Sequence, residues 1–513
     1  MVFEVLKRLK IFIAILATVA IVSALVQLRA ASASVTVTRM TIEGTPATLY
    51  QPTSPVVSGP AVLIAHGFAG SQQLMQSLAL TFARNGYAAL TFDFPGHGRN
   101  PLPLTGSITD PEGATRTLLE AMQPMATLAR ASGDGRLAVL GHSMASDIVV
   151  RFAETVPDVT ATVAVSMFSP AVTATAPRNL LIIVGDWESM LKREALRALN
   201  LATQPSIARP GVTYGSFSDG SARRVAFSAN VEHASVLFSA QTMTEALAWL
   251  DQAFAVTRSA PPLIDHRGPW ILLLIAGVVS LAWPLSGLLP RVAVPAAGAN
   301  LPWHRLWIPL ITPMLVTPLL LRVLPTHFLP VLVGDYLAVH FALYGGITAL
   351  CLGTLRNPSP APTLRSARTW AFWTAACAVI AYGFVALVWP IDTFVTSFVP
   401  SRERSVLILV MLVGTLSYFL SDEWLTRGQS SARGAYLVSK AAFLVSLAIA
   451  VAADLERLFF LIIIVPVIVL FFLVYGLFSR WSYQRTGQPF VAGFANAIAF
   501  AWAIGVTFPL LAG

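Results

Sequence analysis

The clearest fold signal in this 513-residue chain is the stretch RLAVLGHSMAS, residues 136–146. It opens with a short apolar run that is typical of a buried strand, and apolar residues at helical spacing follow Ser143. We therefore expect a sharp strand-to-helix turn at Ser143. Gly141 and Ala145, two positions to either side, are small enough for the strand and the helix to pack closely.

Strand-like and helical runs alternate on both sides of this turn. The alternation is typical of βαβ units and predicts a mostly parallel sheet flanked by helices. The predicted strands are residues 61–67, 87–93, 136–143, 160–168, 180–186 and 223–229, and the predicted helices between them are residues 72–85, 115–131, 145–156, 188–201 and 242–254.

The composition excludes a purely soluble protein. Hydrophobic residues make up 55% of the chain and charged residues only 12%, about half the usual charged share. The net charge of +9 comes mostly from cations between apolar runs, and nothing else supports nucleic-acid binding. Cys351 and Cys377 both lie inside such runs, which argues against a disulfide framework or a thiolate metal cluster. The soluble half has no G-x-G-x-x-G motif, Walker loop or metal-spaced cluster, so neither a cofactor nor a metal is expected.

Nine apolar segments are near the length that crosses a bilayer. The first, residues 11–28, follows Lys7, Arg8 and Lys10 and is interpreted as a signal anchor. A cleaved signal peptide is the alternative, because Ala31, Ser32 and Ala33 form an A-x-A site. The other eight segments are residues 270–289, 306–324, 328–354, 370–390, 405–421, 435–453, 457–478 and 490–511.

Loop charges predict the orientation of these segments. Short cytoplasmic loops collect Lys and Arg, and a cytoplasmic amino terminus places the cation-rich loops inside. This orientation puts residues 34–256 on the extracytoplasmic side of a cell membrane. The predicted regions are the anchor 1–33, the soluble domain 34–256, a Pro-rich linker 257–269 and the multi-pass domain 270–513. The inside loops carry Arg291 and Arg305, then Arg356, Arg365 and Arg368, then Arg427 and Arg433, then Arg480 and Arg485.

Three motifs in chain order resemble the α/β-hydrolase family. GHSMAS at 141–146 resembles its nucleophile elbow, G-x-S-x-G, with Ala145 in place of the last glycine. HGFAGS at 66–71 follows a predicted strand, where the family places its oxyanion loop, and FDFPGHGRN at 92–100 resembles the turn after the next strand. The resemblance implies an α/β-hydrolase fold with Ser143 as the nucleophile. It assigns the oxyanion-stabilising backbone amides to Phe68 and Met144.

The resemblance also implies a base and an acid after the nucleophile, in the order Ser, acid, His. His233 follows the last predicted strand and matches the family's catalytic histidine. The loop GDWES offers two acids, and the family spacing counted from Gly185 favours Glu188, with Asp186 as the alternative.

The remaining histidines of this half are interpreted as structural. His66 and His97 are expected to brace their loops. His142 is next to the nucleophile in sequence, and its side chain is expected to point away from it.

The predicted function is that of a membrane-anchored serine hydrolase, most simply a carboxylesterase, that cleaves an ester, thioester or amide bond. The expected partners are a small-molecule or lipid acyl substrate and the surrounding membrane lipids. Only about ten residues, 169–179, connect two predicted strands where many relatives insert a cap. This resembles the dienelactone-hydrolase-like and cutinase-like branches. The alternative is a transporter or sensor whose hydrolase-like domain is a binding or processing module. Asp335 and His340 are its polar membrane candidates, and hydrogen bonding between helices is the structural alternative for both residues.

Overall fold

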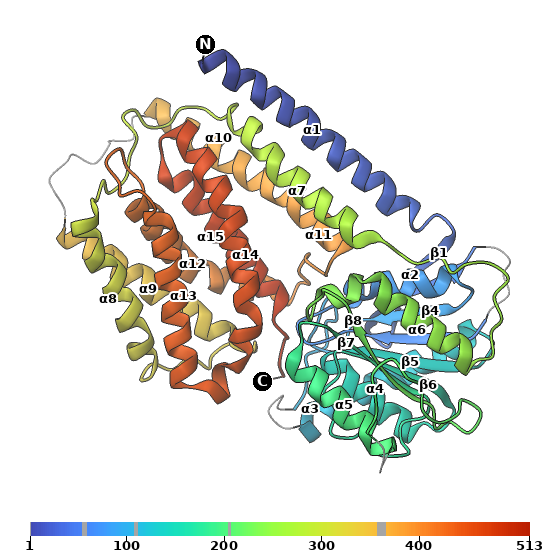
Figure 1. Ribbon diagram of the computed structural model, residues 1–513. Coiled ribbons are helices and arrows are strands. Elements are labelled where there is room, and N and C mark those ends of the chain that lie inside the picture. Colours follow the sequence, from blue (N-terminus) through green and yellow to red (C-terminus); the bar gives the residue numbers. More distant parts are fainter. Residues whose placement is uncertain (1, 54–58, 107–110, 204–206, 356–365, 513) are drawn as a thin grey trace. The chain divides into compact units, whose positions relative to one another are not determined.

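The computed structural model describes residues 2–53, 59–106, 111–203, 207–355 and 366–512. Arg356 and Arg365, two of the cations used for the predicted orientation, lie outside these residues. The chain forms two compact units (Figure 1). The sheet unit comprises residues 22–274, 391–401 and 509–513, and the helical unit comprises residues 1–21, 275–390 and 402–508. Two short segments from the carboxyl-terminal half of the sequence therefore belong to the sheet unit.

One eight-stranded sheet, counted over the described residues, forms the centre of the sheet unit. Its order is β1-β2-β4-β3-β5-β6-β7-β8, with β2 antiparallel to β1 and β4 and all later neighbours parallel. Every residue of β3 and β7 is buried, as expected for parallel strands that are covered on both faces. The strands are β1 (Val35–Ile42), β2 (Thr45–Pro52), β3 (Ala61–Ala65), β4 (Ala88–Phe92), β5 (Leu137–His142), β6 (Val159–Val165), β7 (Leu180–Gly185) and β8 (Arg223–Ser228).

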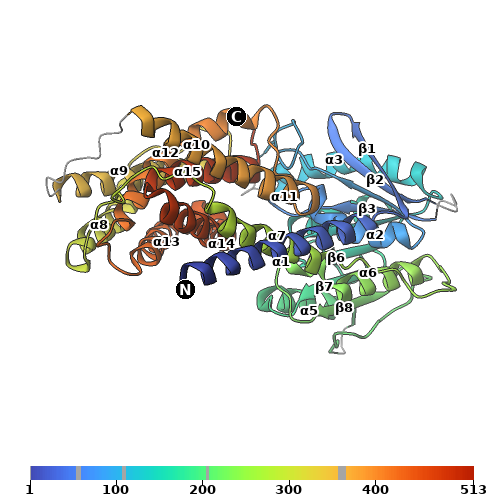
Figure 2. The same ribbon diagram turned by 90° about the horizontal axis from the view of Figure 1, so that it is seen from above.

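Helices cover both faces of the sheet (Figures 1 and 2). Successive strand residues point to opposite faces, so each strand contributes to two cores. Val62 and Ile64 of β3 pack in the core formed with α2 and α6, whereas Leu63 packs in the core formed with α3 and α4. The helices are α2 (Gln76–Arg84), α3 (Pro111–Ser132), α4 (Met144–Thr155), α5 (Ser189–Thr203) and α6 (Ala240–Ala253).

The predicted parallel sheet is confirmed, and all six predicted strands are present with ends that differ by at most three residues. The hairpin of β1 and β2 was not predicted from the sequence. Its turn residues Glu43 and Gly44 have φ values of 49° and 82°, as a two-residue hairpin turn of type I′ requires.

Nine helices of the described chain are long and apolar enough to cross a membrane, which supports the multi-pass prediction. Several boundaries differ from the predictions. The fourth span begins at Gly334 rather than 328, and the eighth continues to Thr486 rather than 478. The fifth continues from α10 through a wider turn, Phe384–Val388, into α11. The helices are α1 (Val2–Ala30), α7 (Arg267–Ser286), α8 (Trp303–Leu321), α9 (Gly334–Thr354), α10 (Ser366–Gly383) with α11 (Trp389–Phe394), α12 (Arg404–Thr426), α13 (Ala435–Ala453), α14 (Leu455–Thr486) and α15 (Pro489–Thr507).

Within the helical unit, α12 packs closely against α9. A Cβ atom added to Gly414 would lie 2.2 Å from the carbonyl oxygen of Ala338, and one added to Gly345 would lie 2.3 Å from the carbonyl carbon of Ser417. Glycine on both helices therefore lets the two backbones approach, as is common between membrane helices.

Buried charges also join helices of this unit. Lys440 of α13 pairs with Asp422 of α12. Glu423 accepts hydrogen bonds from Arg427 (3.0 Å) and from Ser479 of α14 (2.5 Å). An unpaired charge is costly inside a membrane, and the pairing lowers the cost of burying these charged side chains in the helical unit.

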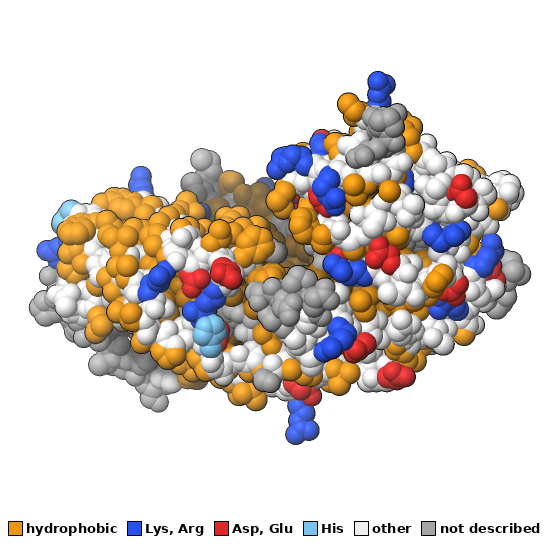
Figure 3. All heavy atoms as spheres, turned by 90° about the horizontal axis from the view of Figure 1, so that it is seen from below, with side chains coloured by type: hydrophobic (Ala, Val, Ile, Leu, Met, Phe, Trp, Pro, Cys, Tyr) orange, Lys and Arg blue, Asp and Glu red, His pale blue; other side chains and the backbone are white. Residues whose placement is uncertain are grey.

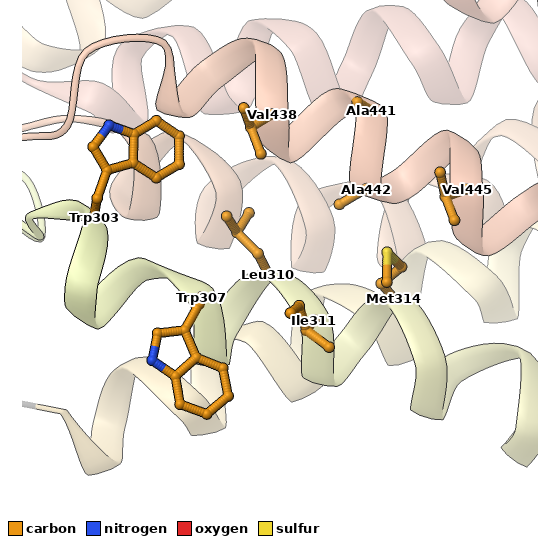
Figure 4. Close-up of a pocket in the computed structure, with 9 residues that line it drawn as sticks. All are labelled: Trp303, Trp307, Leu310, Ile311, Met314, Val438, Ala441, Ala442 and Val445. Atoms are coloured by element: carbon orange, nitrogen blue, oxygen red, sulfur yellow. The ribbon is translucent and has the colours of Figure 1, made fainter.

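Apolar side chains line a groove between α8 and α13 of about 370 Å³ (Figure 4). Trp303, Trp307 and Met314 of α8 face Val438 and Val445 of α13. Figure 3 likewise shows hydrophobic side chains over much of the helical unit. A groove and a surface of this composition suit contact with lipid hydrocarbon.

Candidate active site

Ser143 lies between the last residue of β5 and the first residue of α4. Its φ of 54° and ψ of −118° are strained for a residue with a side chain. A Cβ atom at Gly141 would lie 2.2 Å from the carbonyl oxygen of Ala145, so only glycine fits at this position. The turn therefore has the backbone strain and the close strand-to-helix packing that the sequence predicts.

Three side chains from separate loops form one hydrogen-bonded chain. His233 Nε2 lies 2.8 Å from Ser143 Oγ, and His233 Nδ1 lies 2.6 Å from Glu188 Oε1. Glu188 follows β7 and His233 follows β8. Since the carboxyl ends of parallel strands meet at one edge of a sheet, these loops converge on Ser143. The His233 side chain is 43% exposed, so solvent water reaches it.

Glu188 is held on all sides by donors. Its second oxygen, Oε2, accepts hydrogen bonds from Ser166 Oγ and from the Gly185 amide, both at 2.7 Å. Burial raises the pKa of this carboxyl, but hydrogen bonds from His233, Ser166 and the Gly185 amide outweigh burial and hold the pKa below its usual value. Glu188 is therefore a carboxylate at neutral pH. Ser166 was not singled out in the sequence, because no spacing rule marks it.

Asp186, the alternative acid, has a different partner. Its carboxylate pairs with Lys192 Nζ at 2.6 Å, and the side chain is 47% exposed. Of the two acids in this loop, the structure brings Glu188, and not Asp186, to His233.

The two predicted oxyanion donors flank the nucleophile. Met144 is the first residue of α4, directly after Ser143. Phe68 follows β3 in the loop whose Gly67 would bring an added Cβ atom to 2.9 Å from Ser143 Cβ. The loop therefore lies against the serine.

The other three histidines contact backbone groups. His66 Nδ1 lies 2.8 Å from the carbonyl oxygen of Gly67, and its Nε2 accepts from the Phe94 amide at 3.1 Å. His97 Nδ1 lies 2.9 Å from the carbonyl oxygen of Pro95. His142 Nε2 lies 2.9 Å from the carbonyl oxygen of His233, and burial lowers the pKa of His142 to about 3. These contacts suit loop-bracing residues.

Asp335 and His340 have local partners in the helical unit. The Asp335 carboxylate accepts hydrogen bonds from the backbone amides of Phe328 (3.0 Å) and Tyr336 (2.8 Å). His340 Nε2 lies 3.2 Å from Ser446 Oγ of α13. The described residues include no group of three or more His, Cys, Asp or Glu side chains placed to hold a metal ion.

Comparison with known proteins agrees with this architecture. Residues 58–284 match the model of a family described as serine aminopeptidase, S33. Among curated proteins no significant match was found. The solved structures described next are less than 25% identical to this chain, so they are compared by fold alone.

Three solved structures illustrate the likeness. A Thermus thermophilus protein is 19% identical, covers 44% of this chain and 99% of its own, and has a TM-score of 0.32. A dienelactone-hydrolase-type protein of Klebsiella pneumoniae is 16% identical, covers 44% of this chain and 99% of its own, and has a TM-score of 0.33. A soluble variant of monoglyceride lipase from Saccharomyces cerevisiae is 12% identical, covers 43% of this chain and 96% of its own, and has a TM-score of 0.32. The sheet unit of this chain has the α/β-hydrolase fold and is joined in sequence to helices of membrane-spanning composition.

Proposed function

We propose that this protein is a membrane-held serine hydrolase that cleaves a carboxylic ester through an acyl-enzyme. The observation that carries the proposal is the hydrogen-bonded chain from Ser143 through His233 to Glu188, with the serine on a strained turn. A serine hydroxyl becomes a good nucleophile when a neighbouring base takes its proton and an acid orients that base.

The proposed reaction has two steps. Ser143 Oγ attacks the ester carbonyl carbon while His233 takes the hydroxyl proton, and the amides of Phe68 and Met144 stabilise the oxyanion. His233 then gives this proton to the departing alcohol, which leaves an acyl group on Ser143. Water then attacks the acyl carbon while His233 takes its proton. Collapse of the second tetrahedral intermediate breaks the bond between this carbon and Ser143 Oγ, which takes the proton from His233 as the acid is released.

Exposed apolar side chains favour a substrate with an apolar acyl group. Phe168, which follows β6, is 60% exposed, and Trp187 and Met190, which follow β7, are 65% and 63% exposed. Trp187 and Met190 follow the same strand as Glu188, and Phe168 follows β6, which lies in the sheet between the strands that precede Ser143 and Glu188. The connection 166–179, which the structure describes in full, contains no helix that could cap the site. An open site with an apolar rim suits an acyl chain presented from a lipid.

Hydrolysis of matched esters tests this proposal. We expect purified full-length protein to hydrolyse p-nitrophenyl butyrate with a kcat/KM about tenfold above that for the acetate, because two further methylene groups are buried. Leucine p-nitroanilide is the comparison substrate. Faster cleavage of the anilide than of both esters would overturn the ester proposal in favour of an aminopeptidase.

We also propose that the hydrolase domain is extracytoplasmic. Besides the loop charges, the number of membrane crossings supports the placement of three parts of the sheet unit on the same side of the membrane. Four spans, α7, α8, α9 and α10 with α11, separate the hydrolase domain from the connection 395–401, and four more precede residues 509–512. An even number of crossings returns the chain to the side from which it started, and hydrogen bonds join all three parts.

Single cysteines test the sidedness. Both natural cysteines are first replaced, as Cys351→Ala and Cys377→Ala, and one exposed residue is then changed, either Ser218→Cys in the hydrolase domain or Gln429→Cys between α12 and α13. In intact spheroplasts we expect a membrane-impermeant maleimide to label the cysteine at 218 and to reach the one at 429 only after permeabilisation. The reverse pattern would contradict the proposed orientation.

A further inference from the structure

We propose that residues 391–401, the bracing segment, position the oxyanion loop of the hydrolase site. This inference rests on the proposed function. The segment comprises the last residues of α11, at the end of the fifth span, and the connection to α12, yet it belongs to the sheet unit. It contacts the two loops that follow β3 and β4, which are residues 66–71 and 93–104.

Asp392 holds the bracing segment in a closed turn. Its Oδ1 accepts hydrogen bonds from the backbone amides of Phe398 (2.8 Å) and Val399 (2.9 Å). The amide of Thr396 donates to the carbonyl oxygen of Ile391 at 2.9 Å. The segment therefore has a defined shape of its own, and the second Asp392 oxygen is left to face another partner.

The first contact reaches the end of the oxyanion loop. Ser71 is completely buried, and its Oγ accepts a hydrogen bond from the Ser397 amide at 2.8 Å. The same hydroxyl lies 3.0 Å from Thr396 Oγ1. Ser71 is three residues after Phe68, so this contact fixes the carboxyl end of the turn that carries the proposed oxyanion amide.

The second contact reaches the neighbouring loop. Arg99 Nη2 pairs with Asp392 Oδ2 at 2.5 Å, and the Asp392 side chain is 13% exposed. The two loops are themselves joined, because the Asp93 carboxylate accepts from the Gln72 amide (2.7 Å) and from the Arg99 amide (3.0 Å). The bracing segment thus binds at two points of one hydrogen-bonded assembly.

The carboxyl-terminal residues also contact the loop 93–104, through backbone hydrogen bonds like those between paired strands. The Leu510 amide donates to the carbonyl oxygen of Gly96 at 2.9 Å, and the Leu104 amide donates to the carbonyl oxygen of Leu510 at 2.8 Å. With this end of the loop fixed, loss of the Arg99–Asp392 pair is expected to act locally, on the side that faces the oxyanion loop.

The kinetic consequence follows from where the charge develops. An oxyanion donor binds the tetrahedral transition state more tightly than the planar ester, so a displaced donor lowers kcat and leaves KM nearly unchanged. Loss of a fold-stabilising contact alone would instead lower the amount of active protein without changing kcat per active site. Titration of active sites with a fluorophosphonate separates the two effects.

A double-mutant cycle on the full-length protein tests the proposal, with p-nitrophenyl butyrate as the substrate. Asp392→Asn keeps an oxygen for the amides of Phe398 and Val399 and removes the charge that faces Arg99. We expect Asp392→Asn and Arg99→Gln each to lower kcat per active site about tenfold, since small misplacement of reacting groups is costly. The double variant should be no slower than either single variant.

Two controls keep the result interpretable. Arg130→Gln with Asp158→Asn removes an ion pair of 2.8 Å at the opposite, amino-terminal edge of the sheet and should leave kcat unchanged. Ser71→Ala should reproduce the loss of kcat. Ser77→Ala should not, because it removes a buried hydroxyl that has no hydrogen-bond partner in the described structure. Unchanged kcat in both single variants, or strictly additive effects, would overturn the proposal. An inactive wild type would instead refute the proposed function.

Discussion

Replacement of Ser143 by alanine is expected to abolish ester hydrolysis, with kcat reduced about 10⁶-fold or to the background rate. The bond-forming atom in the proposed reaction is Ser143 Oγ, and the described site offers no second hydroxyl within hydrogen-bond distance of His233 Nε2. The measurement is hydrolysis of p-nitrophenyl butyrate by purified protein.

The Ser143→Ala variant should remain folded. Alanine keeps the Cβ atom, so the strained turn between β5 and α4 is unchanged, and thermal unfolding should stay within a few degrees of the wild type. Full activity in a folded Ser143→Ala protein would exclude the proposed nucleophile.

Glu188→Gln is expected to lower kcat about 10⁴-fold, the scale seen when the orienting carboxylate of such a triad becomes an amide. Glutamine places an NH₂ group against one of its three donors: His233 Nδ1, Ser166 Oγ or the Gly185 amide. It also removes the negative charge that stabilises protonated His233 in the transition state. The measurement is kcat for the same ester.

Asp186→Asn is the matched control, because it makes the same chemical change two residues away. Asp186 pairs with Lys192 and does not contact His233, so kcat should stay within about threefold of the wild type, as for a surface ion pair. If Asp186→Asn lost activity and Glu188→Gln retained it, the assignment of the acid would be reversed.

The sheet was predictable because its parallel strands are continuous apolar runs. AVLIA at 61–65 and LLIIVG at 180–185 are buried on both faces, and this burial is what their composition indicates. The β1–β2 hairpin escaped prediction although VTVTRMTI alternates polar and apolar residues before Glu43 and Gly44. Most side chains of β1 are exposed. An exposed strand needs few apolar residues, so its sequence gives only a weak strand signal.

The candidate triad was accessible from sequence because each member sits at a strand end. Once the strands are assigned, parallel topology brings Ser143, Glu188 and His233 to one edge. Spacing from Gly185 favoured Glu188, and the hydrogen bond to His233 agrees with that preference.

Contacts between distant segments were not predictable from patterns. The span helices follow from composition, but the pairing of Asp422 with Lys440 depends on how α12 and α13 pack. The hydrogen bond between Ser71 and Thr396 joins residues 325 positions apart, and although Ser71 ends the motif HGFAGS, nothing in that motif points to Thr396. Periodicity and spacing report local structure and carry no information on such contacts.

The most direct test of the account is to map the adduct of a fluorophosphonate on the full-length protein in solubilised membranes. The reagent phosphonylates a serine only where a base activates the hydroxyl and donors stabilise the oxyanion. We predict a single modified peptide with the phosphonyl group on Ser143, and no labelling of Ser143→Ala or His233→Ala. Labelling at another serine, or none on the folded wild-type protein, would contradict the central claim that this chain is an active serine hydrolase.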